Sequence, residues 1–227
     1  MKNTKYKKEL PAIDLEKTLS IDEAVEMVVN QPKRKFVESV DVAVSLGIDP
    51  KKSDQNVRGS LTLPHSLGKD VKVVAFVEGD KAAEAKSAGA DFIGTDELLE
   101  KYKDGNIDFD VAVTTPSMMK VVSKLAKVLG PKGLMPNPKS GTVTENIEKV
   151  VKDVKHGQVR FKTEKEGIVQ GTIANSAMDK TKLTENLNSF LAEIKRLKPA
   201  SSKGIYIQDI YLSTTMGPGY RIDVSQF

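Results

Sequence analysis

The sequence contains no cysteine and only two histidines, His65 and His156, among its 227 residues. Without thiols the chain cannot form disulfides or thiolate-bound metal sites, and a zinc or iron site would need carboxylates for most of its ligands. It also lacks any run of roughly 18 apolar residues, the length that a membrane-spanning helix needs. The basic residues 1–8 are not followed by the apolar stretch of a secretory signal. We therefore expect no metal, no other cofactor, no membrane partner and a cytoplasmic location.

Arginine is scarce and unevenly distributed. The net charge is +4, and the whole excess falls on residues 1–66 and 158–227, because acidic and basic side chains balance in residues 67–157. Both ends together also hold every arginine: Arg34, Arg58, Arg160, Arg196 and Arg221. The planar guanidinium of arginine suits phosphates and base edges better than the point charge of lysine. This distribution favours polyanion binding by the two ends, although chance placement of so few residues is the alternative.

Hydrophobic periodicity predicts α+β structure at both ends of the chain. A helix should begin near Ser20 and Glu23, because these residues have the spacing of a capping box and an apolar stripe follows them. Elsewhere the pattern predicts a long amphipathic helix that Pro199 ends and six strands, at residues 36–46, 57–63, 158–163, 168–174, 205–214 and 220–224. The third and fourth strands should form a hairpin around residues 164–167.

The middle of the chain, residues 67–157, has a different pattern. Strands at 71–77 and 109–113 accompany four helices, which the sequence places at 81–87, 96–103, 117–129 and 145–154. Such alternation indicates a parallel sheet with βαβ crossovers. The predicted fold is therefore a split α+β domain, built from residues 1–66 and 158–227, with an inserted three-layer, Rossmann-like α/β domain of residues 67–157. Both connections contain glycine, so we expect the insert to be hinged.

Motifs of common enzymatic chemistry are missing. A dinucleotide site would need G-x-G-x-x-G after the strand 71–77, but the sequence there is Glu78-Gly79-Asp80-Lys81, with one glycine and two acids that would repel phosphate. The segment Gly130-Pro131-Lys132-Gly133 lacks the spacing of a Walker loop. Both histidines fall near the predicted domain crossings, where a linker role is the simpler interpretation. We expect the chain not to be an enzyme.

Two segments have residue types that suit RNA. Lys33-Arg34-Lys35-Phe36 places three cations before a ring that could stack on a base; alternatively, Phe36 is the first core residue of its strand. Ser213-Thr214-Thr215-Met216-Gly217-Pro218-Gly219 joins three hydroxyls to two glycines, which suits 2′-OH groups and the close approach of a nucleic-acid backbone. A plain hairpin turn has the same composition.

A third segment, residues 129–143, contains three glycines, three prolines and the exposed-looking Leu134 and Met135. It is either a functional loop or a rigid connector that packs on its own domain. Two rival functions follow from the middle of the chain. One is a protein-interaction or scaffold module that uses the tip formed by Leu134 and Met135, and the other is a small-molecule-binding α/β enzyme.

Taken together, these segments resemble the bacterial ribosomal L-one family of the large subunit. The residues that carry the resemblance run in order along the chain, at 46–50, 52–59, 63–65, 88–91, 129–143 and 213–219. The resemblance implies a split domain that binds rRNA of the mobile stalk near the tRNA exit site, and an insert that moves on a hinge. It also implies assistance in releasing deacylated tRNA, repression of the protein's own operon mRNA, and a monomer when free of the ribosome.

The resemblance also implies which residues face RNA. The residues that it places on the RNA face are Lys35, Phe36, Glu38, Ser39, Lys165, Thr215, Met216 and Gly217. We add Ser213 and Thr214, the hydroxyl residues that precede Thr215 in the glycine-containing segment, to complete the predicted site. This chain departs from the family pattern at Asp209, where a small hydroxyl residue is expected, and at Glu164 and Glu166, which flank Lys165. These acids either weaken the affinity for RNA or face water.

Overall fold

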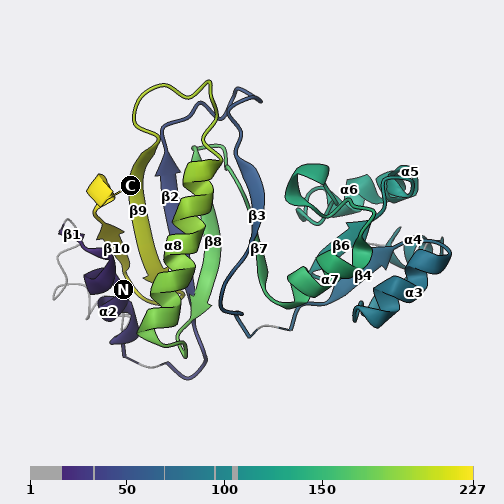
Figure 1. Ribbon diagram of the computed structural model, residues 1–227, viewed down its shortest axis with the longest axis horizontal. Helices are drawn as coiled ribbons and strands as arrows, with labels where there is room; N and C mark the ends of the chain where they lie inside the picture. Colours follow the sequence, from purple (N-terminus) through teal and green to yellow (C-terminus); the bar gives the residue numbers. More distant parts are fainter. Residues whose placement is uncertain (1–16, 33, 69, 95, 104–106, 227) are drawn as a thin grey trace, which may run out of the picture. The chain divides into compact units, whose positions relative to one another are not determined.

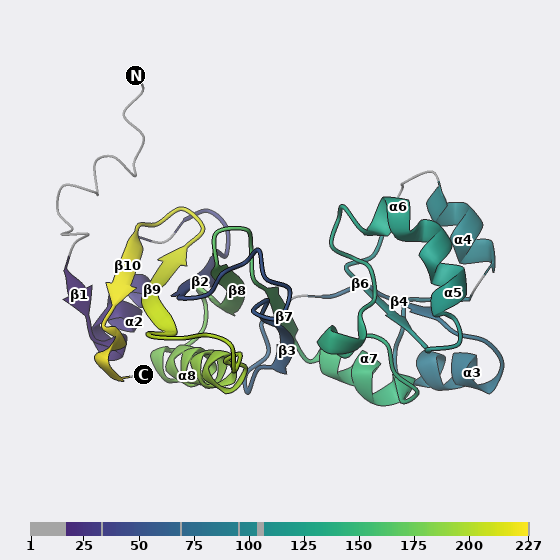
Figure 2. The same ribbon diagram turned by 90° about the horizontal axis from the view of Figure 1, so that it is seen from above.

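The computed structural model describes residues 17–32, 34–68, 70–94, 96–103 and 107–226, and Figures 1 and 2 show the path of the chain. The chain divides into two compact units. One, here the split unit, combines residues 1–67 with 159–227, and the other, here the insert unit, comprises residues 68–158. Among the residues that the structure describes, none of the helices has the length and apolar character needed to cross a membrane.

A five-stranded sheet forms the centre of the split unit. Its order is β1-β10-β9-β2-β8, with bounds Thr18–Leu19 (β1), Ser39–Leu46 (β2), Ile168–Asn175 (β8), Ile207–Thr214 (β9) and Gly219–Ile222 (β10). Neighbouring strands are antiparallel except β1 and β10, which are parallel. The alternation predicted for residues 36–46 is confirmed in β2, where every second side chain is buried. The short β1 was not predicted from the sequence.

Helices α2 (Ile21–Val29) and α8 (Lys180–Arg196) cover one face of this sheet (Figure 2). The predicted capping box is confirmed: Ser20 Oγ accepts a hydrogen bond from the Glu23 amide at 3.3 Å, and the Glu23 carboxylate accepts one from the Ser20 amide at 2.9 Å. Apolar side chains of both helices join those of the sheet in one core. The opposite face of the sheet, here the open face, carries half-buried and exposed side chains such as Tyr211.

The predicted hairpin of strands 158–163 and 168–174 is wrong. β7 (Gln158–Lys162) pairs with β3 (Arg58–Thr62) in a separate two-stranded sheet, whereas β8 joins β2. An isolated bridge between Thr163 and Val169 connects the two sheets. At the turn, the carbonyl of Gly167 accepts a hydrogen bond from the Leu46 amide at 3.0 Å, and this tertiary bond directs β8 to β2.

A three-stranded parallel sheet of order β5-β4-β6 forms the insert unit, which confirms the predicted parallel pairing. Its strands are Val73–Phe76 (β4), Phe92–Ile93 (β5) and Val111–Thr114 (β6). Alternate side chains of β4 and β6 enter two separate cores, one on each face. Helices α3 (Asp80–Ser87) and α4 (Asp96–Lys103) follow the first two strands, and α7 (Ile147–Lys155) ends the unit. The arrangement has three layers.

Two helices of the insert unit differ from the prediction. The helix expected at 117–129 is divided into α5 (Met119–Val122), a 3₁₀ turn (Ser123–Leu125) and α6 (Ala126–Leu129). Ser123 Oγ donates to the carbonyl of Lys120 at 2.6 Å, a local bond of the kind that competes with helical hydrogen bonding. The helix expected to follow Thr144 begins later, because Asn146 caps it by accepting the Lys149 amide at 3.2 Å.

Candidate nucleic-acid interface

Two of the predicted segments meet at the first residue of β2. β9 runs antiparallel to β2 and brings Thr214 opposite Val40, so the loop that follows β9 returns beside Ser39. The Thr215 amide donates to the Ser39 carbonyl, and the Ser39 amide donates to Thr215 Oγ1, both at 3.2 Å. Residues 35–39 and 213–217 therefore form one surface, here the loop end of the sheet, although they are far apart in the sequence.

The loop end presents three exposed apolar side chains. Phe36 and Met216 are each 53% exposed, and Val37, which follows Phe36, is 65% exposed. The alternative in which Phe36 is the first core residue of its strand is wrong, because β2 begins only at Ser39. Lys35, which precedes Phe36 in the sequence, is also exposed. The predicted Lys33 lies outside the described residues. An exposed ring next to a cation is suited to a base or ribose beside a phosphate.

Glu38 holds the loop end together from inside. Its side chain is only 4% exposed, and its Oε1 accepts a hydrogen bond from the Met216 amide at 2.9 Å. The Glu38 backbone is bonded in both directions to Ser176, at 3.0 and 2.8 Å. Glu38 was predicted to face RNA, but the structure gives it little surface to offer. We interpret it as a positioning residue that orients Met216.

Gly217 was expected to leave space for a nucleic-acid backbone, which stays a prediction, but the structure also gives an internal reason for a glycine here. A Cβ atom on Gly217 would lie 2.1 Å from Gln31 Oε1 and 2.4 Å from Thr214 Oγ1. Thr214 is 4% exposed and donates its hydroxyl to Gln31 Oε1 at 2.7 Å, and Gln31 Nε2 donates to the Tyr220 hydroxyl at 3.3 Å. Gly217 and Thr214 therefore serve internal packing of the β9–β10 hairpin.

Ser213 points to the open face of the sheet rather than to the loop. It lies opposite Asp41 of β2 and Gly219 of β10, in a half-buried position. The next row across the open face contains Arg221, Tyr211 and Ala43. Tyr211 is 40% exposed, and sequence reasoning missed it. The alternation of β9 could have placed it on the open face.

Lys165 is exposed at the other end of the sheet. Its turn, residues 164–167, binds Leu46 at the end of β2, whereas the loop end lies at the start of that strand. The eight residues of β2 span about 23 Å at the roughly 3.3 Å rise of a strand. The structure therefore does not bring Lys165 together with Phe36 and Met216. A ligand that touches all three must extend along the open face.

Comparison with known proteins supplies the family. The family model described as "Ribosomal protein L1p/L10e family" matches residues 28–218. The chain belongs to this family. It is 52% identical over 213 residues to the large ribosomal subunit protein uL1 of Cellvibrio japonicus, which covers 94% of this chain and 92% of the relative. Its identity to uL1 of Bdellovibrio bacteriovorus is 52% over 211 residues, with 93% and 90% of the two chains covered. For uL1 of Saccharophagus degradans the identity is 51% over 213 residues, with 94% and 92% covered. The resemblance stated from the sequence is confirmed.

The departure from the family pattern at Asp209 has a partner on the next strand. Arg221 Nε donates to Asp209 Oδ1 at 2.8 Å, and the terminal nitrogen Nη2 donates to the same oxygen. The two side chains are 39% and 29% exposed. The guanidinium therefore compensates the charge of the acid on the open face. Glu164 and Glu166, the other departures, are exposed beside Lys165.

The glycine- and proline-containing loop of residues 129–143 packs on its own unit. Leu134 and Met135 are partly buried against the core that contains Leu129, so the expectation of an exposed apolar tip is wrong. Thr142 is fully buried and accepts the Asn137 amide at 2.8 Å. Val143 forms a parallel bridge to Thr114 at the end of β6. The structure favours the rigid connector over the scaffold tip.

The two histidines have specific structural positions. His65 Nε2 lies 2.6 Å from the carboxylate of Glu185 on α8. Its backbone is bonded in both directions to the side chain of Asn186, which is fully buried. His156 is the C-cap of α7. His65 is therefore anchored to the split unit, which a linker role alone did not predict.

Proposed function

We propose that the chain is a structural protein of the large ribosomal subunit, in the cytoplasm, and that its split unit binds rRNA of the mobile stalk near the tRNA exit site. Relatives about half identical over nearly the whole chain are named large ribosomal subunit protein uL1. The observation that carries the proposal is the loop end. Hydrogen bonds join two distant segments there, and the segments expose Phe36 and Met216 beside Lys35.

The open face of the sheet is the path we assign to the RNA. Lys35 at the loop end and Lys165 at the opposite end would each neutralise phosphates. Between them the strands offer Ser213 and the ring of Tyr211. A-form RNA presents 2′-hydroxyls and base edges in a wide, shallow minor groove. A flat sheet face with hydroxyls and a ring suits that surface, and contacts of this kind recognise shape and 2′-OH groups.

Further roles follow from family membership. The RNA-binding domain is residues 1–66 with 158–227, and the inserted domain is residues 67–157, on a hinge. Support comes from the arginines, all of which fall in the split unit. The insert would assist release of deacylated tRNA from the exit site. The same RNA face would bind the protein's own operon mRNA and repress its translation, and the free protein would be a monomer.

Substitution of the exposed apolar side chains tests the proposed face. Phe36→Ala should weaken binding to a stalk rRNA hairpin by about 1–3 kcal/mol, the value for a ring that stacks on a base. Met216→Ala should also weaken binding, through loss of an apolar contact. Both should leave the Tm nearly unchanged, because the side chains are half exposed. Val29→Ala, at an exposed position of α2, is the matched control and should leave the Kd unchanged.

Filter binding with the stalk hairpin and with a scrambled hairpin, together with thermal melts, measures these effects. Equal affinity for the two RNAs would contradict specific rRNA binding and favour the scaffold hypothesis. A steep fall in the Tm of Phe36→Ala with an unchanged Kd would show that this ring serves folding and that the RNA face lies elsewhere.

A further inference from the structure

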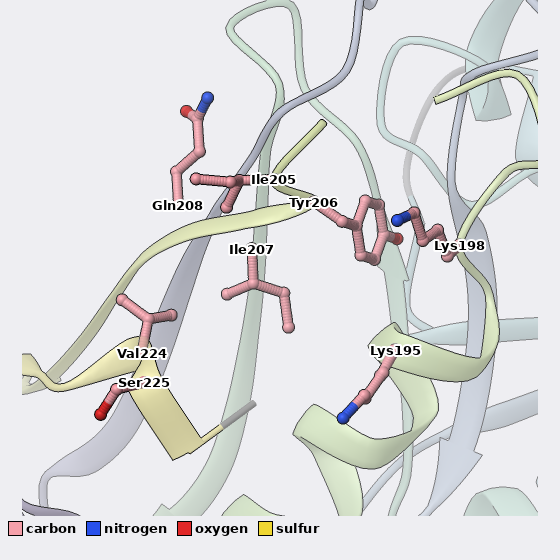
Figure 3. A pocket seen from close by; sticks show the side chains of 8 residues that line it. All are labelled: Lys195, Lys198, Ile205, Tyr206, Ile207, Gln208, Val224 and Ser225. Carbon is pink, nitrogen blue, oxygen red and sulfur yellow. The ribbon is translucent and has the colours of Figure 1, made fainter. Parts of the chain in front are cut away.

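The split unit contains a pocket of about 450 Å³ between the C-terminal end of α8, the start of β9 and the 3₁₀ turn Val224–Gln226 (Figure 3). Pockets of about 300–1,000 Å³ are typical of sites that bind small ligands. Its apolar lining comes from Ile205, Ile207 and Val224. Ile205 is 77% exposed, which is high for a large apolar side chain. A solvent-facing aliphatic surface of this kind is suited to contact with another molecule.

The charged lining of the pocket has one sign. Lys195 and Lys198 of the α8 end both contribute to it, and no carboxylate occurs among the described residues of the lining. Among the described residues, neither lysine forms an ion pair with a carboxylate. Of the nearby acids, Glu193 is paired with Arg196 at 2.6 Å. Asp223 accepts hydrogen bonds from the amide and hydroxyl of Ser225, which favour its charged form, but it is outside the lining. The pocket is therefore positive and complementary to carboxylates.

Tyr206 forms a fixed wall of the pocket. It is 6% exposed, and its hydroxyl donates to the carbonyl of Ile194 at 3.2 Å. Burial raises the pKa of Tyr206 to about 12, so the hydroxyl stays neutral at ordinary pH. The Nζ atom of Lys198 lies 5.8 Å from the centre of this ring, an arrangement that orients the ammonium toward the pocket. Binding would therefore require little rearrangement of this wall.

Beside the pocket, the start of β9 extends past β10, and the 3₁₀ turn Val224–Gln226 packs against β9. β10 ends at Ile222, which pairs with Ile210, so residues 207–209 have a strand neighbour on the β2 side alone among the described strands. Successive side chains of an extended peptide point to opposite sides, so one can enter a pocket while its neighbours reach the rim. An extended segment placed here would bring one side chain to the apolar lining and its neighbours to the two lysines.

We propose that this pocket docks an extended segment of a partner protein in which an apolar side chain is flanked by carboxylates. The apolar side chain lies against Ile205, Ile207 and Val224, and the carboxylates bind Lys195 and Lys198. RNA is a poorer occupant, because the aromatic ring in the lining, that of Tyr206, is only 6% exposed and offers little face on which a base could stack. The proposal is independent of RNA binding, because Ile207 packs in the core on the helix-covered side of the sheet, whereas the RNA is assigned to the open face.

Fluorescence anisotropy on the full chain tests the proposal. The probe is a labelled peptide with a central leucine and phenylalanine flanked by glutamates. The double variant Lys195→Glu/Lys198→Glu should bind it roughly tenfold or more weakly, a loss of about 1.4 kcal/mol, and Ile205→Ser should also weaken it. Lys182→Glu is the matched control, because Lys182 is an exposed lysine of the same helix outside the pocket, and it should bind the probe like the unchanged protein.

Further peptides and RNA separate the alternatives. Exchange of the glutamates for lysines, or of the two apolar residues for serines, should abolish binding, and a saturating stalk hairpin should not displace the probe. Absence of probe binding, or equal affinity of the double variant and of Lys182→Glu, would overturn the proposal. Displacement of the probe by the hairpin, with loss of RNA affinity in the double variant, would instead assign the pocket to the RNA surface. A thermal melt of each variant confirms that it is folded.

Discussion

At the scale of single residues, exposure separates the side chains that can touch RNA from those that shape the site. Phe36 and Met216 are more than half exposed, whereas Glu38 and Thr214 are 4% exposed. The sequence indicated residues 33–36 and 213–219 as candidate segments, because their cations, ring, hydroxyls and glycines are residue types that suit RNA. It did not identify which residues are internal, because the partners of Glu38 and Thr214 belong to other elements. Residue type alone therefore does not separate exposed side chains from internal ones.

Gly217 illustrates this difference with a measurable effect. Gly217→Ala places a Cβ atom against Gln31 and Thr214 and should break their hydrogen bond, at a cost of about 1 kcal/mol. We expect a lower urea midpoint together with weaker hairpin binding, because Met216 is displaced. Wild-type stability with lost RNA affinity would show instead that the position contacts RNA directly. Urea unfolding and the hairpin Kd, measured on the same preparation, decide between these outcomes.

Asp91 should make the insert unit sensitive to acid. Burial would raise the pKa of its carboxyl, but hydrogen bonds from Lys155, at 2.8 Å, and from the Val73 amide outweigh burial and lower it below the usual 3.8. A lowered pKa in the folded state stabilises the protein above the unfolded-state pKa, and this contribution disappears as the pH falls through the folded-state value. Asp91→Asn should therefore cost about 1 kcal/mol at pH 7 and progressively less below about pH 4. Urea unfolding at several pH values checks this, and a cost independent of pH would contradict it.

At the scale of elements, predictions that rest on neighbouring residues are confirmed, whereas a predicted strand pairing that depends on distant residues is wrong. The capping box of α2 and the alternation of β2 depend on neighbouring residues and are confirmed. The hairpin predicted for residues 158–174 failed, because β7 and β8 find partners more than 90 residues away, in β3 and β2. β1 and β5 have two residues each, too few to show a period. Their existence depends on a neighbouring strand.

The N-cap of α2 links helix stability to the RNA face. Ser20→Ala removes the hydroxyl that accepts the Glu23 amide and should cost about 1 kcal/mol. Because Gln31 follows this helix and binds Thr214, a modest loss of hairpin affinity should accompany the loss of stability. Ser20→Asp retains a capping oxygen and should restore both quantities. If Ser20→Asp is as unstable as Ser20→Ala in urea, the cap is not the cause.

The two ends of β2 should contribute separately to the salt dependence of RNA binding. Lys35→Ala and Lys165→Ala should each reduce the slope of log K against log salt by roughly 0.7–0.9, the value for one lost phosphate contact. Their effects should add, because about 23 Å of strand separates them. Lys182→Ala is the matched control. An unchanged slope for Lys165→Ala, measured by filter binding at several salt concentrations, would place the turn of residues 164–167 outside the RNA footprint.

At the scale of the whole molecule, the division of arginine along the sequence matches the division of the chain into units. Every arginine lies in the split unit, while the insert unit uses lysine only. Composition and periodicity indicated mixed α/β structure and a polyanion partner, and the family resemblance supplied the ribosome. From the sequence, Arg221 was noted only as one of the five arginines at the two ends, and its pairing with Asp209 was not predicted. Its role depends on strand pairing.

The most direct test of RNA binding by the split unit uses two shortened chains. One joins residues 1–66 to residues 158–227 through a short flexible linker, and the other is the insert, residues 67–157. The joined ends should bind the stalk rRNA hairpin with nearly the Kd of the full chain, because the loop end, the open face and all arginines lie there. Binding of the hairpin by the insert as tightly as by the joined ends would contradict the account.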